Sequence, residues 1–279
     1  MITDAQIHLW DPNSPERPWP TDRVQAQREA GYFAEDALRE MNAIGVDRAV
    51  LITPSWVGET NETCLAAAKK YPDRFAVMGR IDPRATESKE RLAKWREQEN
   101  MLGIRLTFIQ PFQDLLDNPD IAWFWDAAEE HNIPLMALGI QRMLDKLRAI
   151  LVAHPNLTFI IDHLGATGKG PEGFAHLETL LPMAQESPNL CVKWSSTPNF
   201  SAEPFPHRDI EAPLKRMYDV FGPRRIFWGS DITRLEGSYK NCLEHISQLP
   251  FLSEEDRELI LGKGIAERLR WPEPASVKA

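Results

Sequence analysis

The sequence predicts a single α/β domain, a (β/α)8 barrel, and two observations carry that prediction. Eight short runs rich in Ile, Val, Leu and Phe alternate with longer amphipathic stretches along the 279 residues. Near-continuous apolar runs are typical of parallel strands covered on both faces, and such a barrel takes about 250 residues. An open doubly wound sheet is the alternative, but it normally carries a glycine-rich phosphate loop after its first strand, and this sequence has none.

The elements follow one another regularly. The predicted strands are Ile2–His8, Arg48–Thr53, Phe75–Ile81, Leu102–Phe108, Pro134–Leu138, Thr158–Asp162, Leu190–Trp194 and Arg225–Gly229. The predicted helices are Ala34–Ile44, Asn61–Tyr71, Glu87–Gln98, Asp120–His131, Gln141–His154, Pro171–Glu186, Ile210–Phe221 and Glu236–Leu249. We expect the first helix to end at Gly45, because glycine readily adopts the left-handed conformation of a helix C-cap.

Two segments fall outside this repeat. Asp11 to Gly31 contains four prolines and predicts a long, stiff loop after the first strand, either a functional lid or wall or a plain cover of the barrel mouth. Ser253 to Arg270 predicts one or two extra helices on the outside. We therefore expect one barrel domain over residues 1–271 and a C-terminal tail over 272–279.

Composition narrows the class of protein. The net charge of −9 argues against nucleic acid and anionic membranes as partners, which leaves a small-molecule substrate. Three cysteines without zinc-type spacing indicate reduced core thiols. With no signal peptide or long apolar run visible, we expect a cytoplasmic protein, and a homo-oligomer is possible.

Three polar residues at predicted strand ends converge. A barrel builds its chemistry at the C-terminal ends of its strands, where His8, His163 and Asp231 are expected. An isolated histidine is usually structural, but two histidines and a carboxylate together favour a site. Strict alternation predicts the inward sets Asp4, Gln6 and His8; Gly103, Arg105 and Thr107; Ile161 and His163; and Phe227, Gly229 and Asp231.

Several charged residues lie near these ends. Arg105 inside a strand costs too much to bury unpaired, so it either pairs with an internal carboxylate or binds an anionic substrate, and we favour the substrate. Arg80 and Asp82 are expected to form a structural ion pair. Lys193 either reaches the mouth or forms a buried salt bridge, and the sequence leaves both open.

These motifs, in order, resemble the amidohydrolase-related family, the amidohydrolase 2 branch of the amidohydrolase superfamily. Asp4–Trp10 resembles its opening D-x-H-x-H-x-W strand, and Asp162–Gly165 the D-H-L-G pattern of its sugar-lactone and muconolactone-type lactonases. The other similar segments are Ala68–Pro83, Gly103–Leu106, Val192–Ser195 and Gly229–Asp231. The resemblance implies a hydrolase that opens lactones. It maps the family's metal ligands onto His8, His163 and Asp231.

The sequence departs from the family pattern at two places where the family has metal-binding histidines. Gln6 stands where the family has its first strand 1 histidine, and Leu135–Gly139 lacks the strand 5 histidine. An amide oxygen is a poor substitute for imidazole at zinc. We therefore favour a site that needs no cofactor, with a single divalent metal such as Zn²⁺, held by His8, His163 and Asp231, as the alternative.

The expected reaction is the opening of a small carboxylated or sugar-derived lactone. Asp231 is the candidate general base, and His8 and His163 are expected to polarise the carbonyl. Arg105, Gln6 and Trp10 are the candidate substrate-binding residues. A metal-dependent decarboxylase of an aromatic or muconate-type acid, and a non-catalytic small-molecule binding barrel, remain as alternatives.

Overall fold

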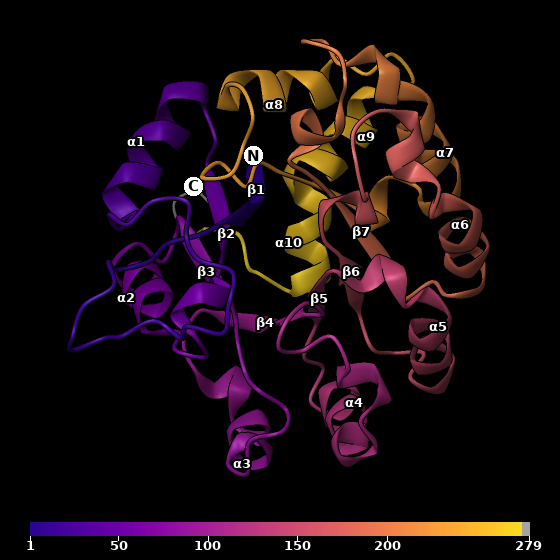
Figure 1. The fold of residues 1–279 in the computed structure, drawn as a ribbon. Coiled ribbons are helices and arrows are strands. Elements are labelled where there is room, and N and C mark those ends of the chain that lie inside the picture. The colour runs from indigo at the N-terminus through magenta and orange to yellow at the C-terminus, as the bar shows by residue number, and fades with distance from the viewer. Residues whose placement is uncertain (275–279) are drawn as a thin grey trace.

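The computed structural model describes residues 1–274 and confirms the predicted barrel (Figure 1). Its eight parallel strands pair in chain order, as expected for successive βα units. The strands are β1 Thr3–Ile7, β2 Arg48–Ile52, β3 Phe75–Gly79, β4 Met101–Thr107, β5 Leu135–Leu138, β6 Phe159–Ile161, β7 Leu190–Ser195 and β8 Ile226–Gly229.

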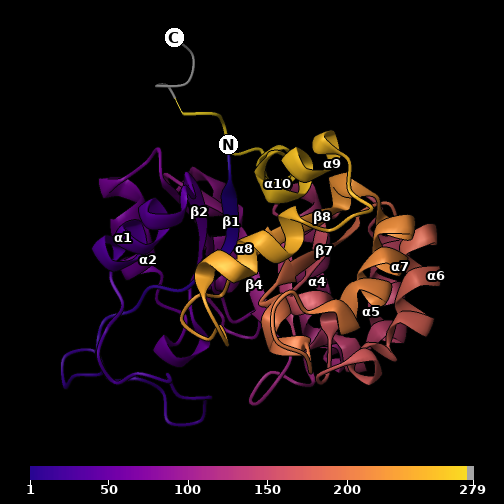
Figure 2. The same cartoon turned by 90° about the horizontal axis from the view of Figure 1, so that it is seen from above.

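A helix follows each strand and covers the outside of the barrel (Figures 1 and 2). These helices are α1 Ala34–Ile44, α2 Glu62–Lys70, α3 Ser88–Ala93, α4 Ala122–Glu130, α5 Leu144–Ala153, α6 Leu177–Glu186, α7 Glu211–Phe221 and α8 Tyr239–Ser247. Helix α1 has the predicted bounds, and Gly45 caps it at φ 77°. Helix α6 begins six residues later than predicted. A short 3₁₀ turn with glycines at positions 170 and 173 precedes it, because glycine disfavours a regular helix.

The barrel closes between β8 and β1. The backbone N–H of Asp231 donates to the carbonyl of Gln6 over 2.8 Å. A Cβ on Gly229 would lie 3.0 Å from Cβ of Gln6, so glycine allows the two strands to approach at this seam. The last strand thereby carries Asp231 directly beside the first strand.

The apolar side chains form two layers. One layer lies between the strands and the surrounding helices, and the other fills the barrel. The interior layer contains Ala5, Val50, Ile52, Ala76, Met78, Leu102, Met136, Ile160, Cys191 and Phe227. The extra C-terminal helices are α9 Glu254–Glu258 and α10 Gly264–Leu269, and Ile265, Leu269 and Trp271 join the interior layer. Helix α10 therefore closes the N-terminal end of the barrel, beside the chain's first residues (Figure 2).

The prediction that side chains alternate strictly between the barrel interior and the helix layer is wrong in two strands. In β1 the pairing register shifts between Asp4 and Ile7, so Ala5 joins the interior. Asp4 turns outward instead and accepts a hydrogen bond from the hydroxyl of Tyr239 on α8 over 2.8 Å. In β6 the interior residue is Ile160, and Ile161 packs in the outer layer. The next inward position is therefore Asp162.

The loop over residues 11–31 lies at the opposite end from α10 (Figure 2). Nε2 of Gln27 donates to the carbonyl of Thr233, which follows β8, over 2.7 Å, and Val24 lines the cavity described below. The loop is therefore part of the wall of the barrel mouth. No helix within residues 1–274 is long and apolar enough to cross a membrane. The predicted tail includes residues 275–279, which lie outside the described residues.

Candidate active site

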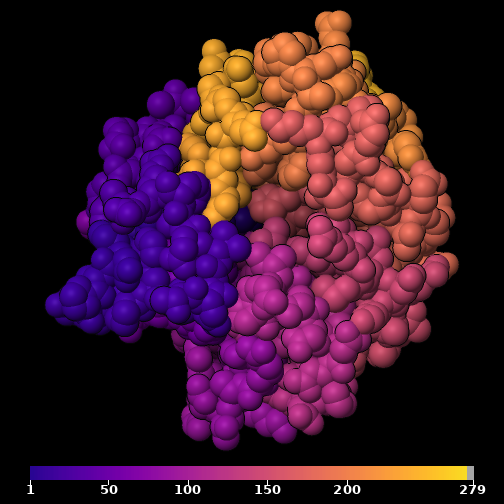
Figure 3. Space-filling model, viewed as in Figure 1, coloured from indigo at the N-terminus to yellow at the C-terminus, as the bar shows by residue number. Residues whose placement is uncertain are grey.

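A cavity of about 310 Å³ opens at the C-terminal ends of the strands. Figure 3 shows the face on which the molecule is hollowed at its centre. The cavity is lined by His8, Val24, Ser55, Trp56, Arg105, Ile109, Leu138, His163, Ser196, Asn199, Phe200, Asp231 and Arg234. The structure thus brings His8, His163, Asp231 and Arg105 together at one cavity, whose size suits a small ligand.

His8 is held as a neutral imidazole that accepts at Nε2. Its Nδ1 lies 2.7 Å from the carbonyl of Ile52, which can only accept, so Nδ1 carries the proton. Burial lowers the pKa of His8 well below its usual value, and the charge of Arg105 lowers it further. Nε2 therefore presents a lone pair, and it lies 3.2 Å from Nε2 of Gln6.

His163 has the opposite tautomer. Ser195 Oγ accepts from the backbone N–H of His163 over 3.2 Å and lies 2.9 Å from its Nδ1. We assign the hydroxyl proton of Ser195 to Nδ1 and the ring proton to Nε2, because Nε2 faces Oδ2 of Asp231 at 3.8 Å. Burial lowers the pKa of His163 to about 4, so the ring is neutral near pH 7. Its Nε2–H is a hydrogen-bond donor at the cavity.

Asp231 lies between the two imidazoles. Its Oδ1 is 3.4 Å from Nε2 of His8, and its Oδ2 is 3.8 Å from Nε2 of His163. Only 3% of Asp231 is exposed, and Oδ1 has no hydrogen-bond partner among residues 1–274. Burial raises the pKa of Asp231 to about 7, although the charges of Arg234, Arg105 and Lys193 lower it. Such a carboxyl can exchange a proton near neutral pH.

Three residues that follow strands have backbone in the left-handed conformation, which directs their side chains toward the cavity. His163, Ser196 and Asp231 follow β6, β7 and β8 and have φ angles of 52°, 56° and 50°. This region is uncommon for residues other than glycine and costs of order 1 to 3 kcal/mol each. It turns the chain sharply at the end of each strand. His163 thereby reaches the cavity although Ile161, two positions earlier, does not point inward.

A buried charge network lies beneath the cavity. Oδ1 of Asp162 forms an ion pair with Nζ of Lys193 at 2.7 Å, and Oδ2 accepts from Nε of Arg105 over 3.1 Å. Burial raises the pKa of Asp162, but these two cations hold it below its ordinary value overall. Lys193 is fully buried and also donates to Oε1 of Gln6. Lys193 thus forms the buried salt bridge and does not reach the mouth.

This network fixes the amide of Gln6. An ammonium group can only donate, so the amide oxygen must face Lys193, and the amide NH₂ must face His8. Gln6 is completely buried, both ends of its amide are occupied, and it does not line the cavity. Gln6 therefore holds His8 in place in this structure, and its expected contact with the substrate stays a prediction.

Arg105 combines the two roles that the sequence left open. Its Nε pairs with Asp162 and its Nη1 donates to Thr107 Oγ1 over 3.1 Å. Its Nη2 has no hydrogen-bond partner among residues 1–274, and Arg105 lines the cavity. The ion pair therefore holds the guanidinium in place while one nitrogen stays available to a ligand.

Arg234 is a cavity residue that sequence reasoning missed. It lies three residues after Asp231, and its guanidinium stands 5.0 Å from the ring centroid of Trp56. Trp56 forms an apolar wall and meets the ring of His8 edge-on at 5.5 Å. The sequence signal that could have identified Arg234 is its position in the loop that follows Gly229–Asp231.

Of two further expectations, the role of Trp10 in substrate binding stays a prediction, and the Arg80–Asp82 ion pair is wrong. Trp10 is fully buried against Tyr32 and Trp56 in the outer layer, so it does not line the cavity. Arg80 and Asp82 do not pair with each other. Nη1 of Arg80 donates to Thr107 over 2.7 Å, and its Nη2 lies 3.8 Å from Glu59. Asp82 pairs instead with Arg84 over 2.9 Å. Arg80 and Arg84 are equally far from Asp82 along the chain, but Arg80 points inward to Thr107 whereas Arg84 lies in the same loop as Asp82.

The donor set does not fit a resident metal ion. The NH₂ of Gln6 faces the lone pair of His8 that a metal would need. The ammonium of Lys193 holds Gln6 in that orientation. Among residues 1–274, no group of three or more His, Cys, Asp or Glu side chains has the arrangement of a metal site. We therefore derive no chemical step through a metal.

Comparison with known proteins gives relatives over most of the chain. An L-fucono-1,5-lactonase of Burkholderia ambifaria is 27% identical over 248 residues, which cover 85% of this chain and 82% of that protein. A 4-sulfomuconolactone hydrolase of Hydrogenophaga intermedia is 22% identical over 237 residues, which cover 82% of this chain and 73% of that protein.

Solved structures share the fold. A probable 2-pyrone-4,6-dicarboxylic acid hydrolase from Acinetobacter baumannii, crystallised with citric acid, superposes with a TM-score of 0.81 at 20% identity and covers 97% of this chain and 99% of its own. An amidohydrolase from Burkholderia multivorans with bound zinc gives 0.81 at 22% identity, with 98% and 100% covered. The family model described as amidohydrolase matches residues 3–270. The chain therefore belongs to the amidohydrolase family.

Proposed function

We propose that this protein hydrolyses a small lactone that carries a carboxylate. The observation that supports the proposal most strongly is the position of Asp231, a buried carboxylate set between two neutral imidazoles in a cavity with two arginines. The two lactone-hydrolysing relatives favour the same reaction class. A lactone has a tethered leaving group and needs less electrophilic assistance than an amide.

Asp231 acts as the general base in this proposal. A water molecule beside Oδ1 gives its proton to the carboxylate as its oxygen attacks the lactone carbonyl. Nε2 of His8 lies 3.4 Å from Oδ1, but its one lone pair already accepts from the NH₂ of Gln6 over 3.2 Å, so His8 borders the water position without binding the water. A neutral His8 with its proton on Nδ1 cannot donate to the carbonyl, so in this proposal His163 polarises the carbonyl and His8 forms the wall beside Asp231.

His163 supplies the hydrogen bond to the carbonyl oxygen. Its Nε2–H is preorganised by Ser195, so negative charge that develops on the oxygen is stabilised without reorganisation. When the tetrahedral intermediate collapses, the ring C–O bond breaks. The leaving alkoxide takes the proton held by Asp231. The product is an open-chain hydroxy acid, and Asp231 returns to its ionised form.

The two arginines bind the substrate carboxylate. The free Nη2 of Arg105 and the guanidinium of Arg234 both belong to the cavity lining. A guanidinium presents a planar fork that matches a carboxylate. Trp56 and Leu138 supply apolar wall beside them. The cavity therefore combines an anion subsite with room for one small ring.

The test is a matched panel of five- and six-membered lactones with and without a carboxylate, with acid release followed by a pH indicator. We expect carboxylated lactones to have the higher kcat/KM, and Asp231→Asn to lose a hundredfold or more. Asp219→Asn is the matched control, since Asp219 is an exposed carboxylate on α7. Full activity of Asp231→Asn would contradict the proposal.

The panel also separates the other reaction classes. Release of carbon dioxide from an aromatic or muconate-type acid, without lactone opening, would indicate a decarboxylase. Binding of a carboxylated lactone without any turnover would indicate a binding protein. Either result would overturn the proposed hydrolysis.

A further inference from the structure

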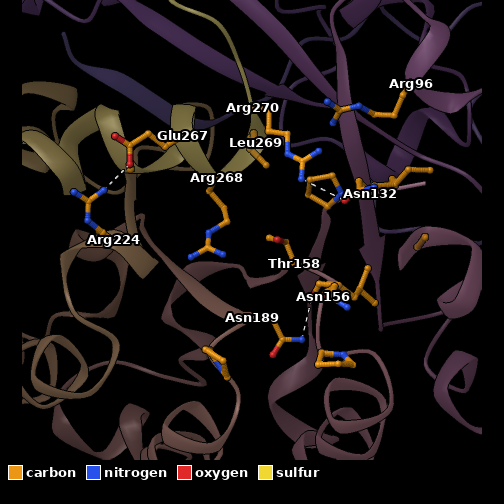
Figure 4. Close-up of a pocket in the computed structure, with 17 residues that line it drawn as sticks. Arg96, Asn132, Asn156, Thr158, Asn189, Arg224, Glu267, Arg268, Leu269 and Arg270 are labelled. Atoms are coloured by element: carbon orange, nitrogen blue, oxygen red, sulfur yellow. Dashed lines mark hydrogen bonds and ion pairs between the residues drawn. The ribbon is translucent and has the colours of Figure 1, made fainter. Parts of the chain in front are cut away.

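A second cavity, of about 610 Å³, lies at the other end of the barrel (Figure 4). The segments that precede β5, β6, β7 and β8 form one side of it, and α10 forms the other. We propose that this cavity binds a small multivalent oxyanion, a phosphate or carboxylate ligand unrelated to the proposed lactone substrate.

The charge of the cavity is the first argument. Its charged side chains are Arg96, Arg224, Arg268, Arg270 and Glu267. Glu267 neutralises Arg224 through an ion pair of 2.7 Å. Three guanidinium groups remain without a carboxylate from the lining. In a chain whose net charge is −9, such a concentration of positive charge is a marked local reversal.

The orientation of Arg268 is the second argument. Figure 4 shows its side chain extending from α10 across the cavity toward Thr158. Arg268 has no ion pair or side-chain hydrogen bond with any of residues 1–274, although it is half-buried. A guanidinium carries five N–H donors, so its position in a concave site favours an anionic partner.

The other two unpaired guanidinium groups, those of Arg96 and Arg270, repel each other. Arg270 reaches the side-chain oxygen of Asn132 over 3.3 Å, and Arg96 donates to the carbonyl of Leu102. Burial lowers the pKa of Arg96, and the charge of Arg270 lowers it further. An oxyanion between them would relieve this repulsion. Because Arg268 adds a third charge, a ligand with two or more negative groups fits better than a single carboxylate.

The two cavities do not overlap. Arg268 and Arg270 lie on or directly after α10 at the N-terminal end of the barrel, whereas Arg234 follows β8 at the C-terminal end. Substitutions in one cavity can therefore be used to assign binding to that cavity.

The experiment is titration calorimetry of the full chain at low salt with pyrophosphate and, separately, with citrate. We expect at least one of them to bind, with an affinity that falls as salt is added. Arg268→Gln should weaken binding about tenfold or more, because a charge-assisted contact is lost. Arg216→Gln is the matched control, since Arg216 is a half-exposed arginine on α7 paired with Glu178.

The two ligands distinguish a phosphate site from a carboxylate site, and either result supports the proposal. If Arg268→Gln alters the thermal midpoint, Arg270→Gln provides a second variant on exposed chain. No binding of either ligand would overturn the proposal. It would also be overturned if binding survived in Arg268→Gln and was lost in Arg234→Gln, because the ligand would then occupy the other cavity.

Discussion

Replacing Asp231 with Asn should make the protein more stable at alkaline pH while removing its activity. The pKa of Asp231 is raised from an ordinary 3.8 to about 7, mainly by burial. Between pH 3.8 and about pH 7, Asp231 is protonated in the native state but ionised in the unfolded chain. The stability that this group contributes is therefore present below about pH 4 and is lost as the pH rises through 7.

The magnitude follows from the shift. At 1.36 kcal/mol for each pH unit, ionised Asp231 costs the folded state about 4 kcal/mol above pH 7. Asn has no charge to bury and tolerates the left-handed backbone at φ 50°. The stability difference between Asp231→Asn and wild type should therefore grow by about 1.4 kcal/mol per pH unit from pH 4 to pH 7 and then level off.

The assay is urea unfolding of both proteins at half-unit pH steps, with Asp219→Asn as the exposed control on α7. The control measures how much of the difference comes from replacing any surface carboxylate by an amide. A difference between Asp231→Asn and wild type that stayed constant from pH 4 to pH 8 would refute the reasoning. Asp231 would then titrate as an ordinary carboxylate and would be a weak base near neutral pH.

Two further predictions concern the charges around the cavity. Lys193→Met should lower the free energy of unfolding by about 3 to 5 kcal/mol, because it removes the 2.7 Å partner of a buried carboxylate, Asp162. Urea unfolding beside the half-exposed Lys215→Met tests this, and a loss below about 1 kcal/mol would show that Asp162 does not need the pair. Arg234→Gln should raise KM for a carboxylated lactone about tenfold and leave a neutral lactone nearly unaffected. It should also move the acidic limb of the rate profile to higher pH, because the charge of Arg234 lowers the pKa of Asp231; equal effects on both lactones would argue against carboxylate binding.

The barrel and the ends of its strands could be predicted because they depend on local pattern. Apolar runs define the strands, which are three to seven residues long, and polar residues at their ends identify His8, His163 and Asp231. The directions of side chains depend on backbone irregularities that leave no signal in composition. A register shift in β1 turned Asp4 outward, and the left-handed His163 reached the cavity from a strand that ends at Ile161.

The chemistry of each ring also required three-dimensional contacts. The two histidines look alike in the sequence, but a backbone carbonyl beside His8 and a hydroxyl beside His163 give them opposite tautomers. Lys193 and Gln6 are 187 positions apart in the chain, and only the closed barrel brings them together. Their contact explains why an amide stands beside His8, which the sequence presented only as a missing ligand.

The most direct test of the account is the pH dependence of kcat/KM for a carboxylated lactone, measured with and without a chelator. The account predicts a rate that rises with pH to a plateau, with an apparent pKa of about 7 from Asp231, and that is the same after chelation. A rate that is abolished by the chelator and restored by zinc would contradict it. His8, His163 and Asp231 would then be metal ligands, and the base would have to be sought elsewhere.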